Sequence, residues 1–524
     1  MAQPKIVYYH DGRHPHIYRY EPPMYPEEYQ ACIDELASTS VEALMFGLAE
    51  GRTMLHNTKA GELWGHNVDK WDHLVFKRAY QNAKGLIEGG YDPLRLVCDR
   101  AKEKGILVYP TLLVQNGGAE SCPVRCSNFR FENAHLEIGA KGDLSADLPG
   151  ITGLDFKHKE VRDERFGIIA EVVNDYSVHG FELNLNHQDT LLFHPGEVEG
   201  GRHIMTEWIG QIHEEVKRSG SDREFVVRVP LGFEDCATYG LDPEEWIKQG
   251  IVDMLAPEPI TGPHRLDPNL DFTPFLKAAV GTNTRILGVL HARVANDRVG
   301  DGPIEMMRAA ACNYWEQGVD GLYVAQWFQQ WPYTGQFYEK LRELPHPDIM
   351  AAKDKYYYVP TEIDTPWNPL TPTKLPIDMS LNNPAAAHFV ISDDLQHWGK
   401  RERIHEVMLR VGISNITEID NVRFSLNDTE LPTGSMRRIN QAYRMNAPRN
   451  RTGPTYWFVF RLESEFWPVK GQNILTATII ERDEHLLGDV RLRDVELEIK
   501  YLMGKSFHRE YVDPDLGHYE HGGM

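Results

Sequence analysis

The sequence predicts an α/β protein in which a (β/α)8 TIM barrel is followed by an all-β sandwich domain. The first 345 residues alternate short apolar runs with longer helical patterns, which is typical of βα units and a parallel sheet. After about residue 345 the runs become β-type and are separated by turn residues. A chain of 524 residues also has the length for two large domains.

Eight apolar runs that lead into polar residues are expected to form the barrel strands. They are residues 6–9, 43–48, 106–113, 180–185, 225–229, 252–256, 285–290 and 321–325. Because an open sheet of parallel strands would leave two exposed edges, closure of the eight strands into a barrel is the economical arrangement.

Helical patterns lie between these runs, at residues 27–36, 93–104, 161–174, 203–217, 243–249, 274–279 and 303–317. Asp92 followed by Pro93 is a typical helix start, with an N-cap carboxylate and a proline in the first turn. Residues 50–75 and 114–155 are long insertions after the second and third strands. Since βα loops build the functional face of such a barrel, we expect them to line a cleft.

The predicted domain organisation follows the change of pattern. The barrel takes residues 1–350, and residues 351–387 are expected to be a linker because 356–376 are rich in Pro and Thr. The sandwich takes residues 388–512, with strands at 405–411, 422–426, 456–461, 473–480 and 490–501. The Gly- and His-rich residues 513–524 are expected to form a flexible tail.

Charge and hydropathy exclude several partners. The 77 Asp and Glu outnumber the 55 Lys and Arg, which gives a net charge of −22. Such a surface repels phosphate backbones and anionic lipids, so we expect neither nucleic-acid nor membrane binding.

The start of the chain shows no signal-peptide pattern, as expected for a cytoplasmic protein or for one whose leader has been removed. A homo-oligomer is compatible with the sequence.

Strand alternation predicts an unusual polar stripe inside the barrel. In residues 180–186 the apolar side chains alternate with Glu182, Asn184 and Asn186, which should therefore face inward. Glu258 stands at the mouth of the sixth strand, between two prolines. Two carboxylates on strands four and six can approach within the range used by glycosidases, one as nucleophile or base and one as general acid. A hydrogen-bonded polar layer and a solvated loop carboxylate are the structural alternatives.

Other side chains at the predicted mouth point to a hydroxylated or anionic substrate. The cationic groups there are His10, Arg228, His291 and Arg293. They could bind such a substrate or could equally neutralise the carboxylates. Trp327 is the best candidate for stacking on a sugar ring. His187 and Asp189 could bind metal, but no partner at zinc-like spacing follows, so neither a metal nor another cofactor is predicted.

Three segments resemble a known family. They are Leu154-Asp-Phe-Lys-His-Lys-Glu-Val-Arg162 with the strand that ends at Asn184, Gly250-Ile-Val-Asp-Met-Leu-Ala-Pro257, and the helix at 92–105. They look like the patterns of glycoside-hydrolase-like (β/α)8 barrels, family-10-like glycosyl hydrolases, over residues 90–330. The resemblance implies a barrel that acts on carbohydrate.

The sequence departs from the family pattern at two points. The acid expected at the end of strand four is Asn184, and the position of Glu258 more often carries an amide. With Glu182 as nucleophile or base and Glu258 as general acid, the layout would be similar to that of alpha-galactosidase-type barrels. The predicted function is glycoside hydrolysis of a poly- or oligosaccharide. The alternatives are a non-catalytic glycan-binding barrel and a metal-dependent sugar isomerase or lyase.

Overall fold

The computed structural model describes residues 3–115, 123–186, 191–259, 265–294, 301–361, 374–440, 455–506, 512–513 and 517–518. The chain forms two compact units. The first holds Met1–His264, Asp271–Ala292 and Gln317–Pro345, and the second holds Arg265–Leu270, Arg293–Glu316 and His346–Met524.

The first unit is built on a closed parallel barrel. Its eight strands follow nearly the predicted bounds: β1 (Ile6–His10), β2 (Ala43–Glu50), β5 (Leu107–Leu113), β6 (Gly180–Asn184), β7 (Glu224–Pro230), β8 (Met254–Glu258), β9 (Arg285–His291) and β10 (Gly321–Ala325). They pair in the order β1-β10-β9-β8-β7-β6-β5-β2, and the pairing of β1 with β2 closes the ring. The predicted fold class is confirmed.

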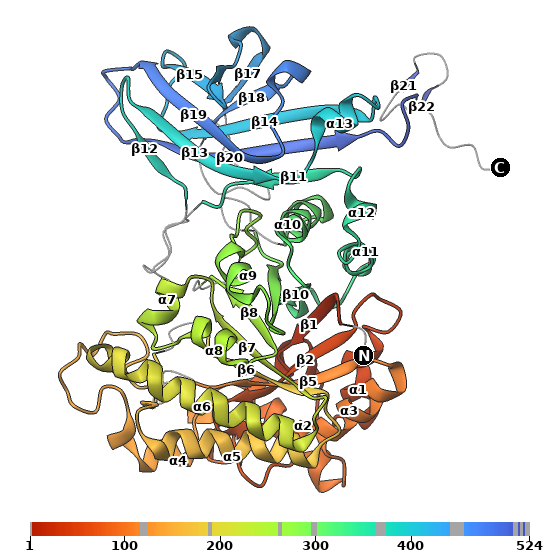
Figure 1. Cartoon of the computed structure of the whole chain (residues 1–524), viewed down its shortest axis with the longest axis vertical. Helices are drawn as coiled ribbons and strands as arrows, with labels where there is room; N and C mark the ends of the chain where they lie inside the picture. Colours follow the sequence, from red (N-terminus) through yellow and green to blue (C-terminus); the bar gives the residue numbers. More distant parts are fainter. Residues whose placement is uncertain are drawn as a thin grey trace. The chain divides into compact units, whose positions relative to one another are not determined.

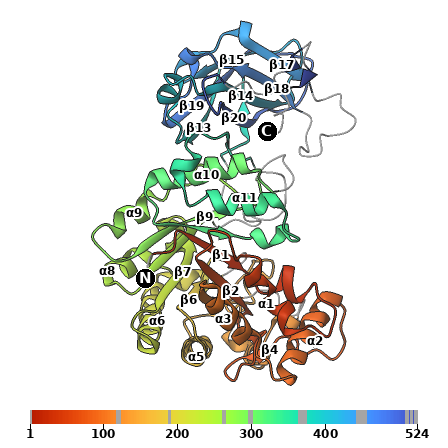
Figure 2. The ribbon, with the colours of Figure 1, turned by 90° about the vertical axis from the view of Figure 1, so that its right-hand side faces the viewer.

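Helices surround the ring of strands, and Figures 1 and 2 show them outside it. They are α1 (Pro26–Asp34), α2 (Leu74–Glu88), α3 (Pro93–Lys104), α4 (Asn128–Glu132), α5 (Lys159–Asp175), α6 (Val198–Ser219), α7 (Phe233–Thr238), α8 (Pro243–Gln249), α9 (Thr273–Ala279) and α11 (Gly335–Glu343). The Asp92 carboxylate accepts a hydrogen bond from the Arg95 amide at the start of α3, as the N-cap pattern predicts. Gly105, with φ of 73°, ends this helix.

The two predicted insertions hold short elements. Strands β3 (Thr53–Met54) and β4 (Glu62–Leu63) extend the sheet beyond β2. The longer insertion contains α4 and the turns Pro123–Arg125 and Ala134–Leu136.

The second unit is a β-sandwich of two antiparallel sheets (Figure 2). Its strands are β11 (Lys355–Tyr358), β12 (Ile377–Met379), β13 (Pro384–Ile391), β14 (Ile404–Ser414), β15 (Asn421–Leu426), β16 (Thr429–Glu430), β17 (Met436–Asn440), β18 (Tyr456–Arg461), β19 (Gly471–Glu481) and β20 (Val490–Tyr501). One sheet has the order β11-β20-β14-β18-β17, with β12 also paired to β20, and the other has β13-β19-β15-β16. Alternating apolar side chains such as Leu409, Leu475 and Leu497 form the common core.

The predicted linker at 351–387 needs correction, because it holds β11, β12 and the start of β13. The Pro- and Thr-rich composition of this segment favours a linker, but its run Lys355-Tyr-Tyr-Tyr358 pairs with β20 through main-chain hydrogen bonds. The unit also includes the short helices α12 (Pro347–Met350) and α13 (Leu395–Gly399). In the predicted tail, β21 (Val512–Asp513) pairs with β22 (Gly517–His518).

The division near residue 350 also differs from the compact units. Residues 265–270 and most of α10 (Ile304–Gln317) belong to the sandwich unit, although they lie between barrel strands in the sequence. Asn313 on α10 donates hydrogen bonds to the carbonyls of Pro268 and Val390. Asn269 donates to the Tyr358 carbonyl and accepts from the Val390 amide.

No helix in the described ranges is both long and apolar enough to span a bilayer.

Candidate functional site

The polar stripe of β6 faces the barrel interior as the alternation predicts. Glu182, Asn184 and Asn186 are buried, with exposed fractions of 0%, 3% and 4%. The interior beside them is lined by apolar and aromatic side chains that include Val226, Met254 and Tyr323. A carboxylate in such a place is costly unless donors satisfy it.

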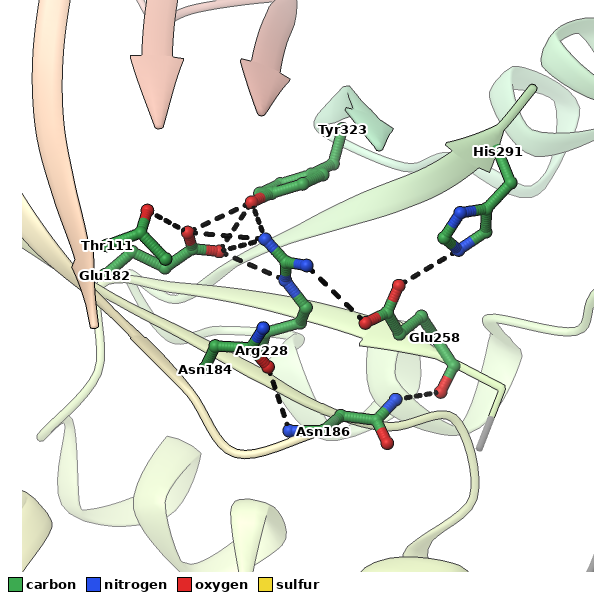
Figure 3. A network of polar contacts seen from close by, with 8 residues as sticks. All are labelled: Thr111, Glu182, Asn184, Asn186, Arg228, Glu258, His291 and Tyr323. Atoms are coloured by element: carbon green, nitrogen blue, oxygen red, sulfur yellow. Dashed lines mark hydrogen bonds and ion pairs between the residues drawn. The ribbon is translucent and has the colours of Figure 1, made fainter. Parts of the chain in front are cut away.

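Glu182 is satisfied by three side chains from three other strands (Figure 3). Thr111 on β5 donates to its Oε2 atom, and the Tyr323 hydroxyl on β10 donates to Oε1 over 2.7 Å. Arg228 on β7 places Nε and an Nη atom 3.3 Å and 3.2 Å from Oε1. The two guanidinium contacts are charge-assisted, so the buried carboxylate is well satisfied.

Glu258 is the second buried carboxylate and has no exposed surface. Its Oε2 atom lies 3.0 Å from Nε2 of His291 on β9, and its Oε1 atom lies 3.7 Å from Nη1 of Arg228. Its main-chain carbonyl accepts a hydrogen bond from the side-chain amide of Asn186, while the Asn186 main-chain amide donates to Asn184. One guanidinium group therefore joins the carboxylates of β6 and β8 in a continuous network (Figure 3).

The electrostatics of the network follow from its burial. Burial alone would favour neutral Arg228, but Glu182, Tyr323 and Glu258 hold the pKa of Arg228 well above its usual value. Burial, with Glu182 nearby, also raises the pKa of the Tyr323 hydroxyl. Arg228 therefore stays charged and Tyr323 stays protonated as a donor. The Arg228 guanidinium carbon also lies 4.4 Å and 4.6 Å from the ring centroids of Tyr9 and Tyr323.

His10 lies at the end of β1, in a second cluster. Its Nδ1 atom accepts a hydrogen bond from the Gly12 amide, and its ring stacks on Phe46 and lies 5.5 Å from that of His16. Burial lowers the pKa of His10 to about 4 and that of His16 to about 3, so both rings are neutral near pH 7. The neighbouring Asp11 carboxylate accepts from the amides of Arg13 and His14 and contacts the His14 ring.

Two of the predicted substrate contacts differ from expectation. The Trp327 indole is fully buried and donates its N–H to the Leu290 carbonyl, so it offers no ring face to a sugar. Its place at the start of a 3-10 turn after β10 puts it in the packed core, against Phe337. Arg293 is exposed and belongs to the second unit. The structure thus brings together Glu182, Asn184, Asn186, Arg228, Glu258 and His291.

The sequence analysis missed Thr111 and Tyr323, which complete the ligation of Glu182. The signal was available, because both stand at inward positions of their strands by the same alternation that selected Glu182. A threonine and a tyrosine among apolar residues are ordinary in strands, so the pattern gave no reason to single them out.

The metal candidates His187 and Asp189 lie outside the described residues. Within the described ranges, no three His, Cys, Asp or Glu side chains are grouped so that they could hold a metal ion.

Part of the chain is similar in sequence to proteins named glycosyl hydrolase. No family model matches the sequence. A protein named glycosyl hydrolase DigH from Escherichia coli strain K12 is 24% identical over 239 residues, which cover 37% of this chain and 51% of that protein. The same protein from strain CFT073 gives the same identity and coverage. The chain thus spans about half the length of the curated relatives it matches.

Solved structures with similar folds include an alpha-amylase from Lactobacillus plantarum, with 12% identity and a TM-score of 0.41 over 90% of this chain and 98% of the amylase. A class V chitininase from Pseudomonas fluorescens Pf-5 has 11% identity and a TM-score of 0.37 over 65% of this chain and 98% of that structure. Since these scores are low, the fold assignment rests on the strand order above.

Proposed function

We propose that the protein hydrolyses glycosidic bonds at the C-terminal end of the barrel, with Glu182 and Glu258 as the reacting carboxylates. The observation that carries the proposal is the position of Arg228, which pairs with Glu182 and lies 3.7 Å from Glu258. Paired carboxylates in different surroundings are what acid and base roles require. The match to proteins named glycosyl hydrolase supports the same class of reaction.

The surroundings suggest how the roles divide. Glu182 accepts hydrogen bonds from Thr111, Tyr323 and Arg228, which hold its oxygens in place as a nucleophile or base requires. Glu258 contacts His291, and an imidazole next to a carboxyl group can pass it a proton. In the proposal Glu258 therefore protonates the leaving oxygen. The attacking water then gives its hydroxyl to the anomeric carbon, and the proton that it releases returns to Glu258 through His291.

Substrate binding is assigned to the polar side chains nearest the mouth of the barrel. Asn184 ends β6 beyond Glu182 and Asn186 follows the strand, and amide groups of this kind donate to and accept from sugar hydroxyls. His10 remains a proposed contact. Arg293 is left out because it belongs to the second unit, and Trp327 because its indole donates to the Leu290 carbonyl and packs against Phe337. An anionic substrate and the family-10-like attribution rest on the sequence patterns alone.

The test is a screen of neutral, uronic and sulfated glycans with the intact chain, read by product chromatography. Glu182→Gln and Glu258→Gln should each lower turnover by at least about a hundredfold while the chain stays folded. Glu215→Gln is the matched control, because Glu215 is a paired glutamate on the outer helix α6. Near-normal turnover in both active-site variants would contradict the proposal.

A second candidate, a glycan-binding barrel without catalysis, is favoured by two observations. Both carboxylates are fully buried, and Asn184 stands where the family pattern has an acid. This function predicts sugar affinity without product release. Calorimetry identifies the sugars that bind, and the chromatography of the same screen shows whether they are cleaved. Binding without products indicates the glycan-binding barrel, and binding with products indicates the hydrolase.

A further inference from the structure

A pocket in the sandwich unit is lined by two tryptophans and by polar side chains. It has a volume of about 300 Å³, at the lower end of the range for ligand sites. Its lining includes Trp315 on α10, Trp398 on α13 and the exposed groups Glu316, Asp394 and Lys470. All of its lining residues belong to the second unit.

The floor of the pocket is held by a buried ion pair. Lys355 Nζ lies 2.9 Å from Oδ1 of Asp393, and their side chains are 1% and 0% exposed. The hydroxyls of Tyr357 and Tyr501 also donate to the Asp393 carboxylate. Because every oxygen of this carboxylate has a donor, the floor is fixed before any ligand arrives, which lowers the entropic cost of binding.

Trp315 and Trp398 both line the pocket, and both are only half-buried. Trp398 is fixed by an edge-to-face contact with Tyr501, 6.1 Å between centroids, and by the Arg403 guanidinium 5.8 Å from its ring. An indole face held in this way is a platform for an apolar ring face.

The charges at the rim nearly cancel. Lys470 Nζ lies 2.7 Å from Oε1 of Glu316, as Lys355 is paired with Asp393, so Asp394 is left as one excess negative charge of the lining. The excess negative charge of Asp394 would repel an anion. A wholly apolar ligand would bury Glu316, Asp394 and Lys470 without replacing their hydrogen bonds to water.

We propose that this pocket binds a neutral sugar unit of a glycan. A pyranose ring has an apolar face for the indoles of Trp315 and Trp398, and its hydroxyls can donate to Asp394 and Glu316 and accept from Lys470. The pocket is proposed to bind the sugar and not to cleave it. It would therefore hold a glycan on the protein whether or not the barrel is a hydrolase.

The experiment uses the intact chain labelled with 5-fluorotryptophan. Fluorine NMR is recorded while maltose, cellobiose or N,N′-diacetylchitobiose is added, and the Trp315 and Trp398 signals are assigned from Trp315→Phe and Trp398→Phe. At least one sugar should shift both signals, and Trp398→Ala should weaken its affinity about tenfold, the effect of losing one stacking contact.

A second variant guards against loss of folding in Trp398→Ala. Lys470→Ala removes a half-exposed rim group and should weaken binding about threefold, while Arg423→Ala, an exposed residue of β15 outside the pocket, should leave affinity unchanged. Glu258→Gln should also leave it unchanged, which separates this site from the barrel. The proposal would be overturned by the absence of any shift, by unchanged affinity in Lys470→Ala, or by a larger response to choline than to every sugar.

Discussion

The Nε2 atom of His291 lies 3.0 Å from Oε2 of Glu258, where strands β9 and β8 end side by side. The two residues are 2% and 0% exposed, so this contact forms away from bulk water. In such surroundings a hydrogen bond between an imidazole and a carboxyl group is stronger than in water. The proposed mechanism uses this pair to deliver a proton to the leaving oxygen.

The first prediction concerns the role of Glu258 as general acid. Glu258→Gln should lower turnover of a natural glycan by about two to four orders of magnitude, because the leaving oxygen must depart without a proton. The loss should shrink markedly with aryl glycosides whose phenolate leaves unaided. Steady-state kinetics on a series of aryl leaving groups measures this. An equal loss for every leaving group would assign Glu258 another role.

Glu182→Gln provides the contrast. A nucleophile or base is needed whatever the leaving group, so its loss should be similar along the same series. If Glu182→Gln showed the dependence expected of Glu258→Gln, the two roles would be exchanged.

The second prediction concerns stability. Arg228→Met leaves the buried Glu182 carboxylate without its cation and should lower the free energy of unfolding by about 3–5 kcal/mol. The double variant Glu182→Gln, Arg228→Met should recover part of this loss, because it also removes the buried charge. Urea unfolding of the three proteins gives the coupling. A loss below about 1 kcal/mol in Arg228→Met would show that the pair is readily replaced.

The barrel could be predicted from the sequence because its strands are short apolar runs with polar ends. Residues 321–325 were predicted as a strand and form β10 over the same bounds. The strand expected at 252–256 forms as β8, two residues further along the chain. It extends because Pro257 and Glu258 continue the pairing with β7. Periodicity also placed Glu182 and Asn184 inside the barrel.

Contacts between distant segments could not be predicted in this way. Nothing local to residues 265–270 or to α10 shows that they belong to one compact unit with β13. Strand β11 was assigned to a linker since its partner, β20, lies more than a hundred residues later. Trp327 follows a barrel strand as a sugar-stacking residue would, and only the packing of Phe337 shows that its ring is enclosed.

The third prediction concerns acid stability. Burial lowers the pKa of His16 to about 3 and that of His10 to about 4, whereas an imidazole in an unfolded chain titrates near 6.5. Between these values the unfolded state binds more protons. Stability is therefore full above about pH 6.5 and falls as the pH drops toward 4, by about 1.4 kcal/mol per pH unit for each ring.

The depressed pKa of Asp11 adds a further loss at lower pH. Burial opposes its ionisation, but His14 and Arg13 hold the pKa of this carboxyl below its usual range, so its stabilisation is present above about pH 4 and is lost below it. His16→Phe should fit between Tyr29 and Phe46 and flatten the slope of unfolding free energy between pH 6.5 and 4. His388→Gln, exposed on β13, is the control. An unchanged slope in His16→Phe would show that folding does not lower the pKa of His16.

The last prediction concerns the boundary of the sandwich. Residues 388–512 expressed alone should lack a cooperative thermal transition, because they omit β11 and β12, which both pair with β20. The omission removes the pairing along one edge of β20 and leaves its main-chain groups there unpaired.

A longer fragment that adds residues 346–387 restores these strands but still omits Asn269 and Asn313, whose side chains donate hydrogen bonds to the carbonyls of Tyr358 and Val390. That longer fragment should therefore melt below the sandwich in the intact chain, as followed by circular dichroism. A cooperative transition of fragment 388–512 at the temperature of the intact chain would instead make the first predicted boundary the true one.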